Sequence, residues 1–155
     1  MSPGDELRDL YQDVILDHGR RPRNFGSVAA ANRRAEGDNP LCGDHLVLSL
    51  EVAGDRLNDV AFEGAGCAIS VASASLMTDT VKGMAVEEAE ALFHRFHHLL
   101  TGEPATAQEL DELGKLAVFS GVRQYPIRVK CATLPWHTLM AALGAGGETT
   151  RVSTE

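Results

Sequence analysis

The sequence predicts an α+β fold in which helices cover a small antiparallel sheet of about three strands. Residues 46–52 and 58–63 alternate apolar and polar side chains, which is the pattern of strands with one face on the core. Gly54-Asp55 lies between them and favours a tight hairpin turn, so the two strands should pair antiparallel. Segments with helical periodicity follow, and strands grouped before helices are typical of α+β architecture.

The N-terminal segment predicts a helix over about residues 3–17, ended by Gly19, because its apolar residues recur at helical spacing. Residues 18–40 are rich in Arg, Pro, Asn and Gly and predict a long loop, with a short strand near residues 33–36. The residues that form the apolar stripe of the first helix are Leu7, Leu10, Tyr11, Val14 and Ile15.

After the hairpin, Gly64-Ala65-Gly66 ends the second strand and helices are predicted in the remaining chain. Pro135 suits the first turn of the last helix, so residues 126–131 are expected to form a turn before it. Residues 1–144 are expected to form a single domain, and residues 145–155 a disordered tail. The predicted helices span about residues 67–82, 86–100, 106–113 and 134–143.

Composition restricts the classes of function. The 155-residue chain carries a net charge of −8, which argues against a nucleic-acid binder. It has no apolar run long enough to span a membrane, and residues 1–19 lack the features of a signal peptide, so a cytoplasmic location is expected. Arginines between residues 20 and 34 are interpreted as a solvated loop, with a docking patch for an acidic partner as the alternative.

The three cysteines lie where a side chain can be directed to a common site. Cys42 and Asp44 share one side of an extended segment. Cys67 begins a helix, whose positive dipole end favours a thiolate. Cys131 follows basic residues, and we expect these to favour its thiolate form as well.

Three thiolates and one carboxylate make a set of four ligands. Thiolates suit Zn²⁺, Cu⁺ or an iron–sulfur cluster, whereas a carboxylate binds such metals more weakly and exchanges more easily. The cysteines form no local CxxC pair, so unrelated buried cysteines remain an alternative on spacing alone.

Four motifs occur in order along residues 10–136. They read LYQDVILDH followed by RPRNFG (10–26), NPLCGD (39–44), GAGCAISVASASLM (64–77) and RVKCATLPW (128–136). Together they resemble the IscU-like (NifU N-terminal-like) iron–sulfur cluster assembly scaffold family. Lys130 stands where the cluster-building members carry His, and about 20 additional residues lie at about residues 90–113; both features resemble the SufU-type branch.

The resemblance implies a Zn²⁺ site formed by Cys42, Asp44, Cys67 and Cys131. It also implies transfer of persulfide sulfur from a SufS-type cysteine desulfurase to Cys42, supported by Arg128, and then to downstream Fe–S assembly proteins. A scaffold holding a transient [2Fe–2S] cluster at the same residues is the nearest alternative. A non-catalytic domain with structural zinc is another.

The remaining histidines carry weaker expectations. Those of the predicted helix 86–100 are expected at the surface, although His94 and His98 share one face. His18 should border a helix end, with a partner contact as the alternative, and His45 is a candidate support for the metal ligands. Residues expected to pack in the interior are Met77, Trp136, Ser70, Ser73 and Ser75, and the surface histidines are His94, His97 and His98.

Overall fold

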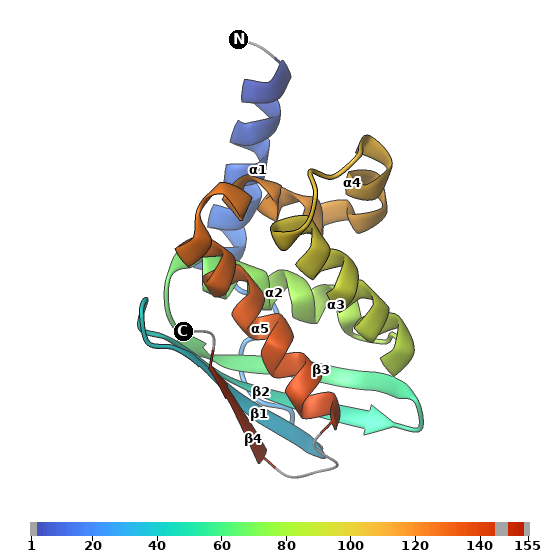
Figure 1. The fold of residues 1–155 in the computed structure, drawn as a ribbon. Helices are drawn as coiled ribbons and strands as arrows, with labels where there is room; N and C mark the ends of the chain where they lie inside the picture. Colours follow the sequence, from blue (N-terminus) through green and yellow to red (C-terminus); the bar gives the residue numbers. More distant parts are fainter. Residues whose placement is uncertain (1–2, 145–148, 154–155) are drawn as a thin grey trace.

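The structure, a computed structural model, describes residues 3–144 and 149–153. A four-stranded sheet lies under a layer of helices (Figure 1). Within the described residues, no helix is both long and apolar enough to cross a membrane. The elements in chain order are α1 (Pro3–Arg20), β1 (Arg33–Asn39), β2 (Asp44–Ala53), β3 (Arg56–Ala65), α2 (Ala68–Val81), α3 (Val86–Thr101), α4 (Ala107–Leu113), the 3-10 helix η1 (Gly114–Gln124), α5 (Pro126–Gly144) and β4 (Thr149–Ser153).

The predicted α+β architecture and hairpin are confirmed. β2 and β3 pair antiparallel through the Gly54 turn, where Gly54 has a φ of +64°, and β1 pairs antiparallel with the other side of β2. A register shift at Glu51 and Val52 marks the only irregularity recorded between β2 and β3 in the described chain. β2 and β3 each run one or two residues beyond their predicted bounds at both ends.

The prediction of three antiparallel strands was wrong for the sheet edge. β4 pairs parallel with β1, so the sheet is mixed and has the order β3-β2-β1-β4. Part of the predicted disordered tail therefore forms a strand, because β1 offers unpaired backbone groups along its free edge. Residues 145–148 and 154–155 of that tail lie outside the described residues.

The helices α2, α3 and α5 lie on one face of the sheet (Figure 1), and the core fills the space between them. Small residues let α2 come close to its neighbours: Ser73 donates a hydrogen bond to the carbonyl of Ala132 on α5, at 2.5 Å. Trp136 of α5 stacks on Phe96 of α3, with ring centroids 4.8 Å apart. The predicted interior positions of Met77 and Trp136 are confirmed, since both are fully buried.

Helix α5 differs most from its prediction. It begins at Pro126 and runs unbroken to Gly144, so Pro135 lies in its interior and Cys131 lies within the helix, not at a joint before it. Pro135 has no N–H to give to the carbonyl of Cys131, one turn earlier. Packing of both ends of α5 against the sheet and α3 outweighs this lost bond. The predictions also missed η1 and the last turn of α1, through Arg20.

The close approach of α5 to β1 depends on Gly37. A Cβ at this position would overlap the Thr138 hydroxyl and press on Leu134, both on α5. We therefore expect Gly37→Ala to lower the free energy of unfolding by about 1–3 kcal/mol, the usual cost of overpacking. Unfolding by denaturant measures this free energy for the variant and for the wild type. Gly121→Ala is the matched control, since a Cβ there meets nothing within 4 Å; equal stability of the two variants would contradict the prediction.

Candidate metal centre

The loop between β1 and β2 presents the first two residues of the site. Residues 40–43 form a turn that is closed by the Cys42 N–H donating to the Asn39 carbonyl, at 3.2 Å. Gly43 follows with a φ of +69°, a conformation that few other residues adopt easily. The chain then enters β2 at Asp44, whose side chain is buried. The turn thus leaves Cys42 partly exposed and places Asp44 inside.

Cys67 is the N-cap of α2, as its position in the sequence predicted. Its Sγ accepts a hydrogen bond from the N–H of Ser70, at 3.4 Å, and its own N–H donates to Asp44 Oδ1, at 2.8 Å. The Cys67 Sγ lies 3.8 Å from Asp44 Oδ2. Gly66 makes this approach possible, because a Cβ there would overlap the Asp44 carboxylate.

Cys131 reaches the same place from α5. It is buried, and its Sγ lies 3.2 Å from the Sγ of Cys42. The side-chain amide of Asn39 lies 3.6 Å from the Cys131 sulfur and directs an N–H toward it. The ligand atoms of Cys42, Asp44 and Cys131 all lie within 4.8 Å of one another. Cys67 adjoins this group through Asp44, so the four residues singled out in the sequence gather at one point.

The electrostatics of Cys131 differ from the sequence-based expectation. Burial, followed by the contacts with Asp44 and the two other thiols, raises the pKa of the Cys131 thiol well above its ordinary value. The neighbouring basic residues do not offset this, because Arg128 is exposed and its guanidinium lies over the Tyr125 ring, at 4.8 Å. Without a bound cation, Cys131 therefore holds its proton at neutral pH.

The donor set fits a soft divalent metal ion. Three sulfurs and a carboxylate oxygen converge, and N–H groups of Asn39, Cys67 and Ser70 point at these same atoms. Such donors stabilise thiolates and carboxylates in their ionised forms, which are the forms that bind a metal. The sequence analysis did not predict that Asn39 and Gly66 help to form the site. Their positions next to the cysteines, Asn39 in NPLCGD and Gly66 in GAGC, were the signal that could have identified them.

The other candidate residues lie outside the cluster. His45 forms a hydrogen bond with Asp38, with Nδ1 and Oδ1 2.6 Å apart, and no contact described for His45 joins it to a thiol. His18 is buried and hydrogen-bonds to Ser75, at 2.7 Å, so it supports packing of α1 on α2. Burial lowers the pKa of His18 and keeps its imidazole neutral.

Comparison with known proteins places this arrangement in context. A family model described as the NifU-like N terminal domain matches residues 10–132. The chain is 40% identical over 139 residues to the zinc-dependent sulfurtransferase SufU of Bacillus subtilis, covering 90% of this chain and 92% of that one. It is 40% identical over 138 residues to the iron–sulfur cluster assembly scaffold protein IscU of Streptococcus pyogenes, covering 89% and 85%.

Solved structures share the fold. A candidate iron–sulfur cluster assembly scaffold protein of the SUF system from Fervidobacterium islandicum superposes with a TM-score of 0.79 at 35% identity, covering 88% of this chain and 98% of that one. The N-terminal part of a NifU-like protein from Brucella abortus superposes with a TM-score of 0.77 at 24% identity, covering 88% and 94%, and shows likeness of fold alone.

The burial and raised pKa of Cys131 predict an order of thiol reactivity. In chelator-treated protein at pH 8, we expect iodoacetamide to modify Cys131 at least about tenfold more slowly than Cys42, because the thiolate is the nucleophile and each pKa unit changes its population tenfold. Peptide mass spectrometry over time measures both rates. Equal rates in protein that remains folded would contradict the described geometry.

Proposed function

We propose, from the premise that this chain belongs to the NifU-like N-terminal family of IscU/SufU-type iron–sulfur cluster assembly proteins, that it is a zinc-binding sulfur acceptor of that assembly. The observation that carries the proposal is the convergence of three thiols with one carboxylate. A closed structural zinc site normally has Cys and His ligands only, whereas a carboxylate ligand leaves an exchangeable position.

The metal ligands in this proposal are Cys42, Asp44, Cys67 and Cys131. Bound there, Zn²⁺ would lower the pKa values of the thiols and keep them as thiolates. Asn39 and the N–H of Ser70 hold two of the sulfurs by hydrogen bonds, and the N–H of Cys67 holds the carboxylate. The similarity to a SufU protein named as zinc-dependent supports zinc over other soft ions.

Cys42 is the sulfur acceptor in this proposal. It lies on a short loop and is partly exposed, whereas Cys131 is buried in a helix and the sulfur of Cys67 is held by the α2 N-terminus. The Cys42 thiolate attacks the outer sulfur of a persulfide on the donor cysteine. The S–S bond breaks, the donor cysteine leaves as a thiolate, and Cys42 retains the persulfide, with no net oxidation or reduction.

The partner in this step is a cysteine desulfurase of the SufS type. Exposed apolar side chains next to the site support docking of a protein: Leu41 precedes Cys42, and Ile127 lies one helical turn before Cys131. Tyr125 is also exposed, and the guanidinium of Arg128 stacks on it. In this proposal Arg128 steadies the freed thiolate during docking, and the sulfur then passes to downstream Fe–S assembly proteins.

Substitution of Cys42 tests the acceptor role. We expect Cys42→Ala to lose persulfide labelling and desulfurase stimulation, because Cys131 is buried and the sulfur of Cys67 accepts a hydrogen bond at the start of α2. The measurement is transfer of ³⁵S from labelled cysteine in the presence of a SufS-type desulfurase, with and without chelator. Asp55→Ala, in the hairpin at the other end of β2, is the control and should retain transfer. Full stimulation by Cys42→Ala would reject the assignment.

Metal analysis separates the proposal from its two alternatives. Anaerobically purified protein should contain one zinc per chain and no acid-labile sulfide, whereas sulfide with iron would indicate a scaffold carrying a [2Fe–2S] cluster. For a domain with purely structural zinc, chelation would unfold the chain, and blocking a freed thiol would change no transfer activity. Lys130 in place of the His of cluster-building members supports the zinc-binding reading.

Substitution of Gly66 tests zinc ligation without replacing any of the four proposed ligand residues. We expect Gly66→Ala to weaken zinc affinity by about 10–100-fold, the usual effect of disturbing groups that orient metal ligands, because its Cβ displaces Asp44. Competition with a chromophoric chelator measures the affinity. Gly121→Ala, whose Cβ meets no atom within 4 Å, should bind as wild type. Unchanged affinity of Gly66→Ala would remove Asp44 from the ligand set.

A further inference from the structure

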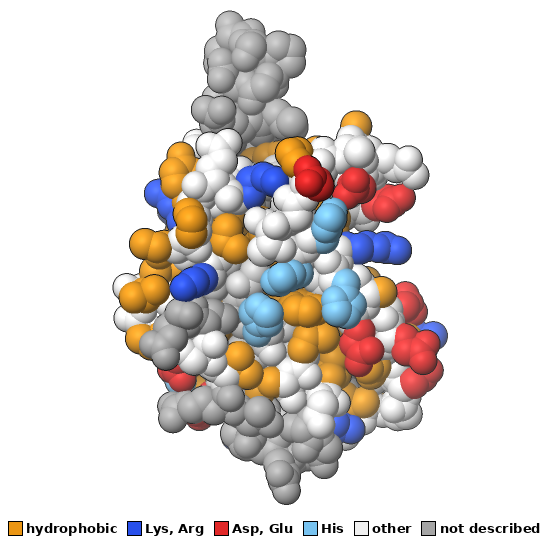
Figure 2. Space-filling view, viewed as in Figure 1, with side chains coloured by type: hydrophobic (Ala, Val, Ile, Leu, Met, Phe, Trp, Pro, Cys, Tyr) orange, Lys and Arg blue, Asp and Glu red, His pale blue; other side chains and the backbone are white. Residues whose placement is uncertain are grey.

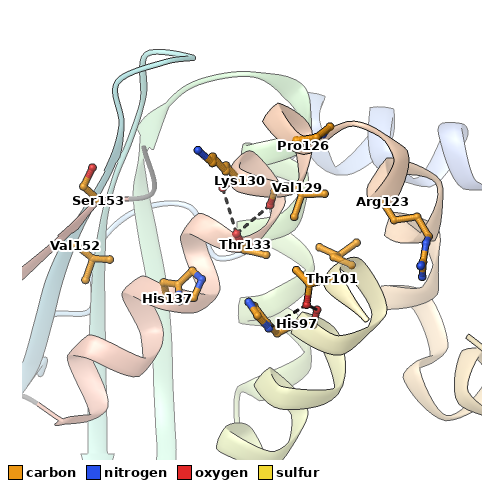
Figure 3. Close-up of a pocket in the computed structure, with 11 residues that line it drawn as sticks. His97, Thr101, Arg123, Pro126, Val129, Lys130, Thr133, His137, Val152 and Ser153 are labelled. Atoms are coloured by element: carbon orange, nitrogen blue, oxygen red, sulfur yellow. Dashed lines mark hydrogen bonds between the residues drawn. The ribbon is translucent and has the colours of Figure 1, made fainter. Parts of the chain in front are cut away.

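A groove of about 570 Å³ lies between α3 and α5, and none of the four candidate ligands lines it. Residues of α5 that recur every three or four positions line one wall, and residues 97, 100 and 101 of α3 line the other (Figure 3). Arg123 of η1 closes one end, and Val152 and Ser153 of β4 close the other. Its volume is within the range of small-molecule sites, about 300–1,000 Å³.

The ionisable side chains that line the groove are all basic, in a chain with a net charge of −8. Lys130, Arg123 and two histidines line it, and none of its described lining residues is acidic. Figure 2 shows histidine side chains gathered over α3 and α5 next to hydrophobic surface. The apolar lining residues are Leu100, Pro126, Val129 and Val152.

The two histidine rings pack edge-on against each other and line the groove together. The rings of His97 on α3 and His137 on α5 (Figure 3) have centroids 5.7 Å apart. Phe93 packs edge-on against His137, with centroids 5.3 Å apart. Burial, together with the neighbouring His97, lowers the pKa of His137, which leaves its imidazole neutral when no anion is near. Arg123 is held in place by hydrogen bonds to the carbonyls of Leu99 and Gly102, at 3.1 and 2.7 Å.

The groove adjoins the metal centre along α5 and β4. Lys130 and Thr133 flank Cys131 in sequence but lie on the groove face of the helix, whereas Cys131 is buried toward the other ligands. Val152 and Ser153 also line a separate hollow next to Gly43 and Asp44. An occupant of the groove would therefore contact the same helix and strand that border the site.

We propose that this groove binds a small organic anion, whose carboxylate or phosphate group lies among Lys130, His97 and His137 and whose hydrocarbon part lies on Val129 and Val152. A basic, partly apolar cavity without a carboxylate recognises such a ligand by charge and shape. This function is additional to sulfur transfer and does not depend on the identity of the metal.

Histidine NMR on the full-length, metal-loaded chain tests the proposal with inorganic phosphate and with citrate as separate probes. We expect at least one probe to shift the His97 and His137 ring resonances saturably and to raise the pKa of His137, since a bound anion favours the imidazolium form. Saturation by phosphate alone, or by citrate alone, identifies the favoured anionic group. No saturable shift with either probe would overturn the proposal.

Two charge-removing variants localise the binding. Lys130→Gln and His137→Gln should each weaken binding of the active probe by at least about tenfold, the scale of a lost charge-assisted hydrogen bond. His94→Gln, on the same helix as His97 but lining a different pocket, is the matched control and should bind within about twofold of wild type. Equal weakening by all three variants would assign binding to general surface charge and reject the groove.

Discussion

The N–H of Cys67 donates to the carboxylate of Asp44, and this one hydrogen bond connects the start of β2 to the start of α2. It fixes the distance between the loop that carries Cys42 and the helix end that carries Cys67. Gly66 is required because any side chain there would occupy the space of the carboxylate. The same carboxylate therefore orients the site, and in the proposed metal centre it would also be the most exchangeable of the four donor groups.

A buried cluster of three thiols and a carboxylate is costly unless its charges are balanced. In the absence of a cation, the raised pKa of Cys131 keeps the proton on this thiol, which avoids a buried negative charge. A bound divalent ion would instead neutralise ionised thiolates and the carboxylate. The N–H groups directed at the Cys67 sulfur and the Asp44 carboxylate favour these ionised forms. The burial of Cys131 and the partial exposure of Cys42 support the roles proposed for them, metal holding for Cys131 and sulfur acceptance for Cys42.

The sequence predicted those features that depend on local patterns or on ordered motifs. Alternation identified β2 and β3, and the glycine-rich segment before Cys67 identified the start of α2. Pairing of β4 with β1 could not be predicted, because a parallel edge strand leaves no local signal. Pro135 misled the prediction of α5 because tertiary packing outweighed its local preference. The expected thiolate character of Cys131 failed because burial depends on the whole fold.

The order of the ligands along the chain has a consequence during synthesis. Cys42, Asp44 and Cys67 lie on contiguous elements that leave the ribosome together, whereas Cys131 emerges only with α5. A nascent chain thus contains three of the four candidate donors before Cys131 has been synthesised. In the proposed metal site, the fourth donor would therefore join the other three only when α5 docks on β1 over Gly37.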